Sequence, residues 1–248
     1  DLADEGDDPP AQRLEALAAY RADLDAVYAG RPVSPRWRPV FDALARTVEH
    51  HRLPHALLTD LLSAFSQDVT VTRYADRAAL LDYCRRSANP IGRLLLHLYG
   101  VHDADALRRS DDICTALQLI NFWQDLSVDL PRARNYVPHA DAQRHGVSWR
   151  GHKAMPDTPA ARALVRDLVH WAAALITEGA ALPPRIPGRA GWELRLVLHG
   201  GWRVLEKIAR MDYASMAHRP RLQMSDLPLL LWRCVRYSSA WFSPARLP

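Results

Sequence analysis

Residues 113–129 are the segment that most constrains how this 248-residue chain can fold. Most helices of soluble proteins carry one apolar stripe and a broad polar face. This segment has the inverse pattern, because apolar side chains occupy most of its helical circumference and leave only one narrow polar stripe. That stripe consists of Gln118, Asn121, Asp125 and Asp129, which recur at intervals of three or four residues. The pattern predicts a helix buried among other helices.

Asp125 and Asp129 on this stripe need a partner, because burying an unpaired carboxylate is very costly. The partner can be a metal ion, a cationic residue or a wet cavity. Carboxylates at i and i+4 lie roughly 5–6 Å apart between Cβ atoms. Mg²⁺ binds one or two carboxylates together with phosphate oxygens and water. The spacing fits a magnesium site, although the same DxxxD spacing also occurs on many solvated helix faces.

The rest of the chain has helical periodicity and no alternating strand pattern or hairpin turn. Ser34-Pro35 is interpreted as an N-cap and first-turn proline, and the polar stretch 66–72 as a connection. Pro90 is expected to kink or break its helix, and 183–188 reads as a linker. The helices are predicted near residues 14–28, 37–48, 54–65, 76–99, 105–129, 158–179, 191–210 and 225–237. The chain is therefore predicted to be all-α and to form one domain.

Composition excludes several classes of protein. With 48% hydrophobic and 24% charged residues, the chain can bury a core and is not expected to be disordered. No apolar run approaches the roughly 20 residues that cross a bilayer, and three isolated cysteines favour a reducing, cytoplasmic setting. The net charge of +4 suits an anionic small substrate or a membrane surface as well as nucleic acid. Without a basic helix or aromatic platform, no nucleic-acid partner is expected.

Two further clusters could cooperate with the polar stripe. The chain begins with Asp1, Asp4 and Glu5, which read either as a frayed acidic terminus or as a second metal-binding cluster on a facing helix. Arg132 and Arg134 follow the stripe and could bind phosphate oxygens in bidentate fashion. The run 227–232 is rich in leucine and either packs into the core or touches a membrane peripherally.

Three sequence stretches carry a family resemblance. Residues 118–129, followed by Arg132, Arg134, Tyr136 and Pro138, resemble the second aspartate-rich region of squalene and phytoene synthases. Residues 1–5 resemble the end of their first region, DDxxDE, and Tyr83-Cys84 followed by Gly92 is similar to a third family motif. The resemblance covers almost the whole chain in order. Residues 83–93, and Gln124 where many members have arginine, are most similar to the bacterial hopanoid-pathway branch of hydroxysqualene synthases.

The resemblance implies an all-α, single-domain bundle of the isoprenoid-synthase type around a central apolar cavity. It implies an enzyme that uses Mg²⁺ to convert presqualene diphosphate to hydroxysqualene with release of pyrophosphate. Asp125, Asp129 and Asp4 would hold Mg²⁺, with Asp1 and Glu5 as secondary ligands. Tyr83, Gln118 and Asn121 would lie near the reacting carbons, and Gln118 or Asn121 would orient a water. Binding of the substrate is expected from Arg132, Arg134, Tyr136, Arg85 and Arg93.

Two alternatives remain open at this stage. One is head-to-head condensation of two prenyl diphosphates, which gives squalene, dehydrosqualene or phytoene. The other is a non-catalytic assembly factor that keeps the fold, a reading that the absence of the first aspartate of DDxxDE would favour. That absence also leads us to expect that the chain is a fragment without its N-terminal helix. The sequence leaves the oligomeric state undetermined.

Overall fold

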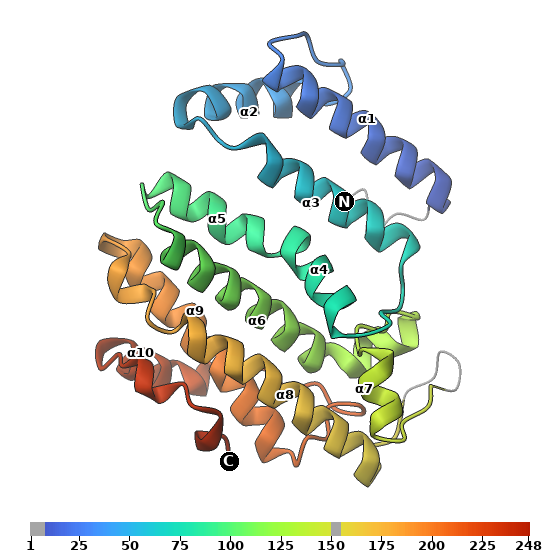
Figure 1. Cartoon of the computed structure of the whole chain (residues 1–248), viewed down its shortest axis with the longest axis vertical. Helices are drawn as coiled ribbons and strands as arrows, with labels where there is room; N and C mark the ends of the chain where they lie inside the picture. Colours follow the sequence, from blue (N-terminus) through green and yellow to red (C-terminus); the bar gives the residue numbers. More distant parts are fainter. Residues whose placement is uncertain (1–7, 150–154) are drawn as a thin grey trace.

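The computed structural model describes residues 8–149 and 155–248, and in these ranges the chain is built from helices. Figure 1 shows most of the long helices as roughly parallel rods, from α1–α3 at one end of the molecule to α8–α10 at the other. The α-helices are α1 (Pro10–Tyr28), α2 (Arg38–His51), α3 (His55–Thr70), α4 (Arg77–Ser87), α5 (Asn89–Leu98), α6 (Ala104–Asp129), α7 (His139–Arg144), α8 (Pro159–Gly179), α9 (Gly188–Arg210) and α10 (Leu227–Val235). Short 3₁₀ helices are η1 (Leu130–Arg132), η2 (Pro183–Arg185), η3 (Met224–Asp226), η4 (Ser239–Trp241) and η5 (Pro244–Arg246).

The prediction of an all-α fold is confirmed. Among the described residues, extended pairing is limited to one isolated bridge between Arg73 and Asn135. The helix that the inverted pattern predicted is α6, which packs along α8 and also contacts α4, α5 and α9. Its apolar residues Leu119, Phe122 and Trp123 are buried in the main core. Because these apolar side chains are buried in the core, the polar stripe lies on another face of α6.

The helix predicted around Pro90 is broken, as expected. α4 ends at Ser87 and α5 begins at Asn89, so that Pro90 occupies the first turn of the new helix, where a missing N–H costs little. Gly92 then lets α5 approach α6 closely. A Cβ atom at this position would lie 2.3 Å from the Ser110 hydroxyl and 2.6 Å from the Cys114 sulfur, both on α6.

Two details of the predicted helices were wrong. Ser34 does not cap a helix, because its backbone N–H and hydroxyl donate to the two carboxylate oxygens of Asp23 at 2.7 and 2.5 Å, and α2 begins only at Arg38. Residues 66–70 are not a connection but the last turn of α3. Val69 is buried and Asp68 accepts a hydrogen bond from α4, so tertiary contacts override the local β-propensity of this stretch.

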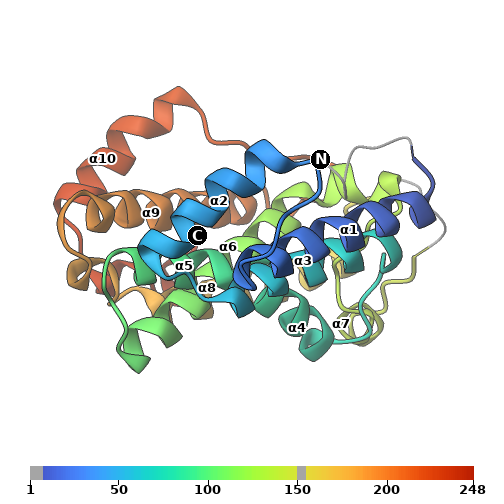
Figure 2. The ribbon, with the colours of Figure 1, turned by 90° about the horizontal axis from the view of Figure 1, so that it is seen from above.

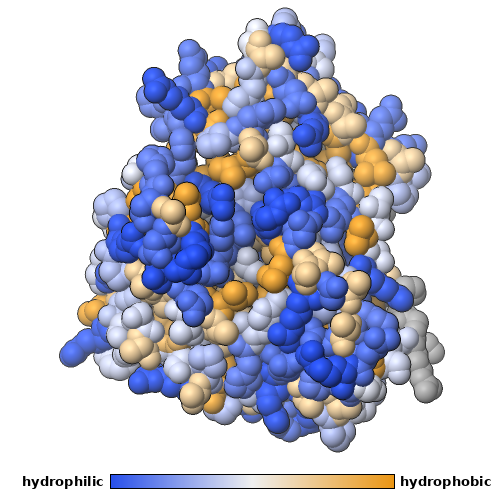
Figure 3. Space-filling view, in the orientation of Figure 1, coloured by the Kyte–Doolittle hydropathy of each residue, from blue (hydrophilic) through white to orange (hydrophobic). Residues whose placement is uncertain are grey.

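The buried apolar side chains form one main core and two smaller clusters. The main core joins α4, α6, α8 and α9, whereas Leu24, Phe41 and Leu62 form a separate cluster that holds α1, α2 and α3 together. Figure 2 shows α1 and α2 lying over the α3 side of the bundle, with α10 at the opposite edge. The face seen in Figure 3 is mostly hydrophilic, with small separate hydrophobic areas. In the described part of the chain, no helix has the length and hydropathy that a membrane span requires.

Candidate active site in the cavity beside α6

The polar stripe of α6 borders a cavity of about 770 Å³ between α1, α3, α4, α6 and the segment that follows α6. All four residues of the stripe line it, and Asn121 is the most exposed of them. The structure also brings to this cavity four other residues that the sequence singled out, namely Tyr83, Arg132, Arg134 and Tyr136. The cavity therefore collects eight of the predicted site residues from three separate segments.

The two carboxylates of the stripe differ in how their charges are compensated. Asp125 accepts two hydrogen bonds from Arg219, at 2.5 Å from Nε and 2.9 Å from Nη2. Burial raises the pKa of Asp129 to about 6, and the charge of Asp125 adds to the increase, whereas the positive charges of Arg134 and Arg132 oppose it. A cation bound between these carboxylates would relieve both the burial and the repulsion.

The residues after α6 fold back onto the cavity. Ala133 adopts a left-handed conformation (φ 64°), and the N–H of Arg134 donates to the carbonyl of Asp129 at 3.0 Å. The N–H of Asn135 donates to the carbonyl of Thr72 at 2.9 Å, which ties this segment to the residues just after α3. This turn explains why Arg132 and Arg134, which lie beyond the helix, still face the same cavity as Asp129.

Aromatic rings form one wall of the cavity. Tyr136 stacks on Phe122 with ring centroids 3.8 Å apart and planes at 6°. The ring centroid of Tyr83 lies 6.1 Å from that of Tyr136, and its hydroxyl donates to Asp68 Oδ2 at 3.0 Å. Burial raises the pKa of Tyr83, and the nearby negative charge of Asp68 raises it further, so the phenol stays neutral and remains a hydrogen-bond donor.

Two charged residues of the cavity were not among the predicted site residues. Asp68 belongs to the stretch that was interpreted as a connection, although it follows Phe65 by three residues, the helical spacing that places both side chains in the cavity. Arg219 lies in the segment between α9 and η3, and no sequence spacing indicates that it pairs with Asp125. Gln124 helps to hold this segment, because its side-chain amide donates to the carbonyl of Pro220 at 2.8 Å.

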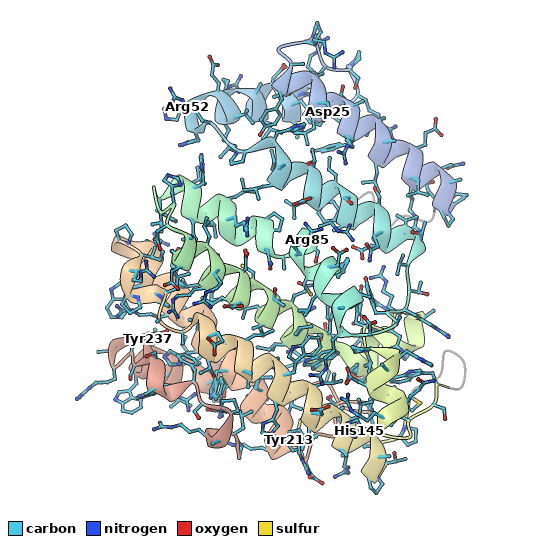
Figure 4. The ribbon with its side chains drawn as sticks, viewed as in Figure 1. Asp25, Arg52, Arg85, His145, Tyr213 and Tyr237 are labelled. Carbon is cyan, nitrogen blue, oxygen red and sulfur yellow. The ribbon has the colours of Figure 1, made fainter. Side chains whose placement is uncertain are left out.

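Two predicted substrate-binding residues are not brought to the cavity. Arg85, labelled on α4 in Figure 4, donates to Asp82 Oδ1 at 2.9 Å and is more than half exposed. Arg93 on α5 makes a bidentate pair with Asp111, at 2.9 and 2.6 Å. Since both guanidinium groups are already paired with carboxylates outside the cavity, we assign them no part in the site.

The described residues fit a magnesium ion that takes some of its ligands from the protein and the others from a bound phosphate and water. No group of three or more His, Cys, Asp or Glu side chains in ranges 8–149 and 155–248 could hold a metal ion alone. Asp125 and Asp129 can supply two carboxylates, and Mg²⁺ commonly takes its remaining ligands from phosphate and water. The other predicted ligands, Asp1, Asp4 and Glu5, lie outside the described residues.

A second, apolar groove of about 320 Å³ borders the same helix. Ser110, Cys114 and Leu117 line this groove, and they continue the helical spacing of Gln118, Asn121 and Asp125 toward the N-terminal end of α6. From Ser110 to Asp129 this face of α6 extends over roughly 28 Å. One face of α6 thus carries carboxylates near its C-terminal end and borders an apolar groove nearer its N-terminal end.

This arrangement defines an enzyme of the isoprenoid synthase class, with charged groups at one end of a helix face and apolar groups at the other. The chain belongs to the squalene/phytoene synthase family, whose family model matches residues 1–227. It is 32% identical to the phytoene synthase of Thermus thermophilus over 231 residues, which cover 93% of this chain and 78% of that protein. It is 30% identical to the hydroxysqualene synthase of Sinorhizobium fredii over 233 residues, covering 93% of this chain and 76% of the relative.

Solved structures agree with this assignment. The squalene synthase HpnC from Alicyclobacillus acidocaldarius superposes with a TM-score of 0.79 at 36% identity, covering 86% of this chain and 79% of that one. A dehydrosqualene synthase in complex with ligand superposes with a TM-score of 0.78 at 22% identity, covering 90% and 78% of the two chains, and supports the fold alone.

Proposed function

We propose that this enzyme converts presqualene diphosphate and water to hydroxysqualene and pyrophosphate in a Mg²⁺-dependent reaction. The observation that carries the proposal is the face of α6, which borders the cavity with Asp125, Asp129 and their neighbouring arginines at one end and an apolar groove at the other. Such a face suits a ligand with an anionic head and a long hydrocarbon tail. The hydroxysqualene synthase of Sinorhizobium fredii and the structure of squalene synthase HpnC favour this substrate within the family.

In this proposal the diphosphate binds at the charged end of the face. Asp125 and Asp129 would hold Mg²⁺, which as a Lewis acid neutralises the charge that develops on the leaving diphosphate. Arg132 and Arg134 border the same cavity and can donate to phosphate oxygens. Arg219 donates to both oxygens of Asp125, so it would have to release this carboxylate for a metal ion and could then donate to a phosphate oxygen. Asp1, Asp4 and Glu5 remain proposed as further metal ligands.

Cleavage of the carbon–oxygen bond releases pyrophosphate and leaves a cyclopropylcarbinyl cation, which rearranges before water captures it. The stacked rings of Phe122 and Tyr136 can stabilise positive charge through their faces and shield it from bulk water. Gln118 and Asn121 have amide groups in the cavity and can orient one water molecule. The neutral hydroxyl of Tyr83 is held by Asp68 nearby. The captured water loses a proton to the released pyrophosphate, which gives hydroxysqualene.

The test is product analysis of the purified chain with Mg²⁺ and presqualene diphosphate. We expect pyrophosphate release and hydroxysqualene in the lipid extract, and in ¹⁸O-labelled water the product alcohol should carry the label. The reaction without Mg²⁺ and the Asp125→Asn variant provide the negative controls. Pyrophosphate release without an alcohol product, or no turnover by a folded protein, would contradict the proposal.

Head-to-head condensation is the second candidate, because a phytoene synthase is among the most similar relatives at 32% identity. Farnesyl or geranylgeranyl diphosphate should then give squalene, dehydrosqualene or phytoene, whereas added presqualene diphosphate would not be converted to an alcohol. Running the substrates in parallel with the same protein preparation separates the two reactions.

A further inference from the structure

The segment formed by η3 and α10 exposes an apolar surface. Its outward residues are 39 to 81% exposed and recur at helical spacing, so they form one continuous stripe. We call this stripe the α10 face, and it consists of Met224, Leu227, Leu231, Trp232 and Val235. Figures 1 and 2 place α10 at the edge of the molecule beside α9. A helix at the surface of a soluble protein normally turns its polar side outward.

The inward side of the same segment carries charged groups. Asp226 is buried and bonds to Arg203 at 2.9 Å and to Lys207 at 2.7 Å, both on α9. Glu206 of α9, also buried, bonds to Arg203 and to Arg233 of α10, each at 2.8 Å. Ionic contacts therefore fix α10 against α9 with its apolar side outward. The orientation is specified by these pairs, so a rotation that buried the apolar residues would break them.

The charge beside the α10 face is positive. In residues 213–248 the only acidic side chain is Asp226, which is buried beneath the helix. Arg221 and Arg236 are exposed, one before the α10 face and one directly after it. An apolar stripe with arginines at both ends matches a surface that offers hydrocarbon next to negative charge.

We propose that the α10 face docks onto an anionic lipid bilayer surface. The nine residues of α10 are about 14 Å long, a length that can lie in the interfacial plane but cannot cross it. Trp232, which is 55% exposed, is a residue type that favours the membrane–water interface. Arg221 and Arg236 reach anionic headgroups while the leucine and valine side chains enter the acyl boundary. This docking involves no residue of the α6 cavity, so it holds or fails independently of the proposed reaction.

A second copy of the chain fits this surface less well than lipid. A stable dimer needs about 800 Å² of buried surface on each partner, which a nine-residue helix can supply only as part of a larger interface. A symmetric contact through the α10 face would also bring Arg221 and Arg236 of both copies together. The segment 213–248 has no exposed acidic side chain to pair with them.

The experiment measures co-sedimentation of the full chain with vesicles of phosphatidylcholine, with and without phosphatidylglycerol. We expect binding to the anionic vesicles and a decrease in partitioning of about tenfold or more for Leu231→Ser/Val235→Ser. Arg221→Gln/Arg236→Gln should weaken binding to anionic vesicles about tenfold at low salt, and added salt should reduce this difference. The matched control is Val40→Ser/Leu98→Ser, which removes two side chains of similar exposure on α2 and α5 and should bind like the native chain.

A second measurement keeps the proposal testable if the serine variants do not fold. Brominated acyl chains quench tryptophans that enter the bilayer, so the native chain should be quenched and Trp232→Phe should lose most of that quenching. The proposal is overturned if the folded Leu231→Ser/Val235→Ser variant binds anionic vesicles as well as the native chain. It is also overturned if light scattering shows a dimer that this variant abolishes, since the α10 face then binds a second copy.

Discussion

This protein has two pairs of acidic residues in different settings, one pair partly buried and the other buried. Asp125 and Asp129 line the cavity beside α6, whereas Glu206 and Asp226 lie between α9 and α10. Each member of the second pair is bonded to two cationic side chains, drawn from Arg203, Lys207 and Arg233. In the first pair, Asp125 is bonded to one cationic side chain among the described residues, that of Arg219, and Asp129 has cationic neighbours whose charges do not offset its burial.

Asp129 from the first pair and Asp226 from the second have pKa values shifted in opposite directions. Burial and the charge of Asp125 raise the pKa of Asp129 to about 6. Burial would also raise the pKa of Asp226, but hydrogen bonds from Lys207, the Gln223 backbone and Arg203 outweigh it and hold that pKa below its usual range. Buried acids that are fully compensated join helices together. Acids that are left partly uncompensated retain the capacity to bind a cation.

The largest expected difference between the pairs is in turnover. Asp125→Asn removes one of the two carboxylates available for Mg²⁺, and we expect kcat to decrease on the order of 10³-fold, because metal and oxyanion groups each contribute several kcal/mol to such transition states. Circular dichroism should show an unchanged fold. The matched control is Asp111→Asn, which breaks the bidentate pair with Arg93 outside the cavity and should leave kcat nearly unchanged. Retained activity in Asp125→Asn would argue against the metal role.

Substitution in the second pair, Glu206 and Asp226, should lower the free energy of unfolding rather than the turnover rate. Asp226→Asn leaves Arg203 and Lys207 without their shared carboxylate, and breaking a buried ion pair by removing one partner costs about 3 kcal/mol or more. We expect urea unfolding at neutral pH to show this loss, while kcat per folded molecule stays near the native value. A loss below about 1 kcal/mol would show that solvent already compensates this cluster.

The polar stripe could be predicted from the sequence because it depends only on residues within one helix. The spacing of Gln118, Asn121, Asp125 and Asp129 on one helix, and the apolar residues around them, are properties of a single segment. The break at Pro90 and the start of α8 at Thr158 are local as well, since proline and an N-cap act within one turn.

The partners of these residues depend on the tertiary fold. Arg219 lies 94 residues from Asp125, and no sequence spacing connects them. Asp68 became part of the site because α3 continues to Thr70, a result of packing that local propensity did not favour. Arg85 has the residue type expected of a phosphate ligand, but its position on α4 places it against Asp82 instead.

His199 lies beside the Glu206–Arg233 ion pair, and we expect it to affect the free energy of unfolding less than Asp226 does. Its side chain is buried, and burial together with the charge of Arg233 lowers its pKa to about 4. An unfolded histidine has a pKa near 6.5, so below that pH the unfolded state takes up a proton that the folded state does not. The free energy of unfolding should therefore decrease by about 2 kcal/mol from pH 7 to pH 5 on account of this residue. His199→Gln should flatten the curve by that amount, and parallel curves for the two proteins would contradict the assignment.

The smallest expected effect tests whether the cavity retains an uncompensated charge. Because the pKa of Asp129 is raised in the folded state, its ionisation disfavours folding, and the free energy of unfolding should fall as the pH rises from 4 to 6. In buffer with a chelator at pH 7, Asp129→Asn should therefore be more stable than the native chain by about 1 kcal/mol after allowance for solvent screening. At pH 4 the two proteins should be equally stable. Adding Mg²⁺ with pyrophosphate should reverse the order at pH 7, because only the native chain gains binding energy from both carboxylates. If Asp129→Asn were less stable at pH 7 with chelator present, Asp129 would be a structural acid like Asp226, and the contrast between the two pairs would fail.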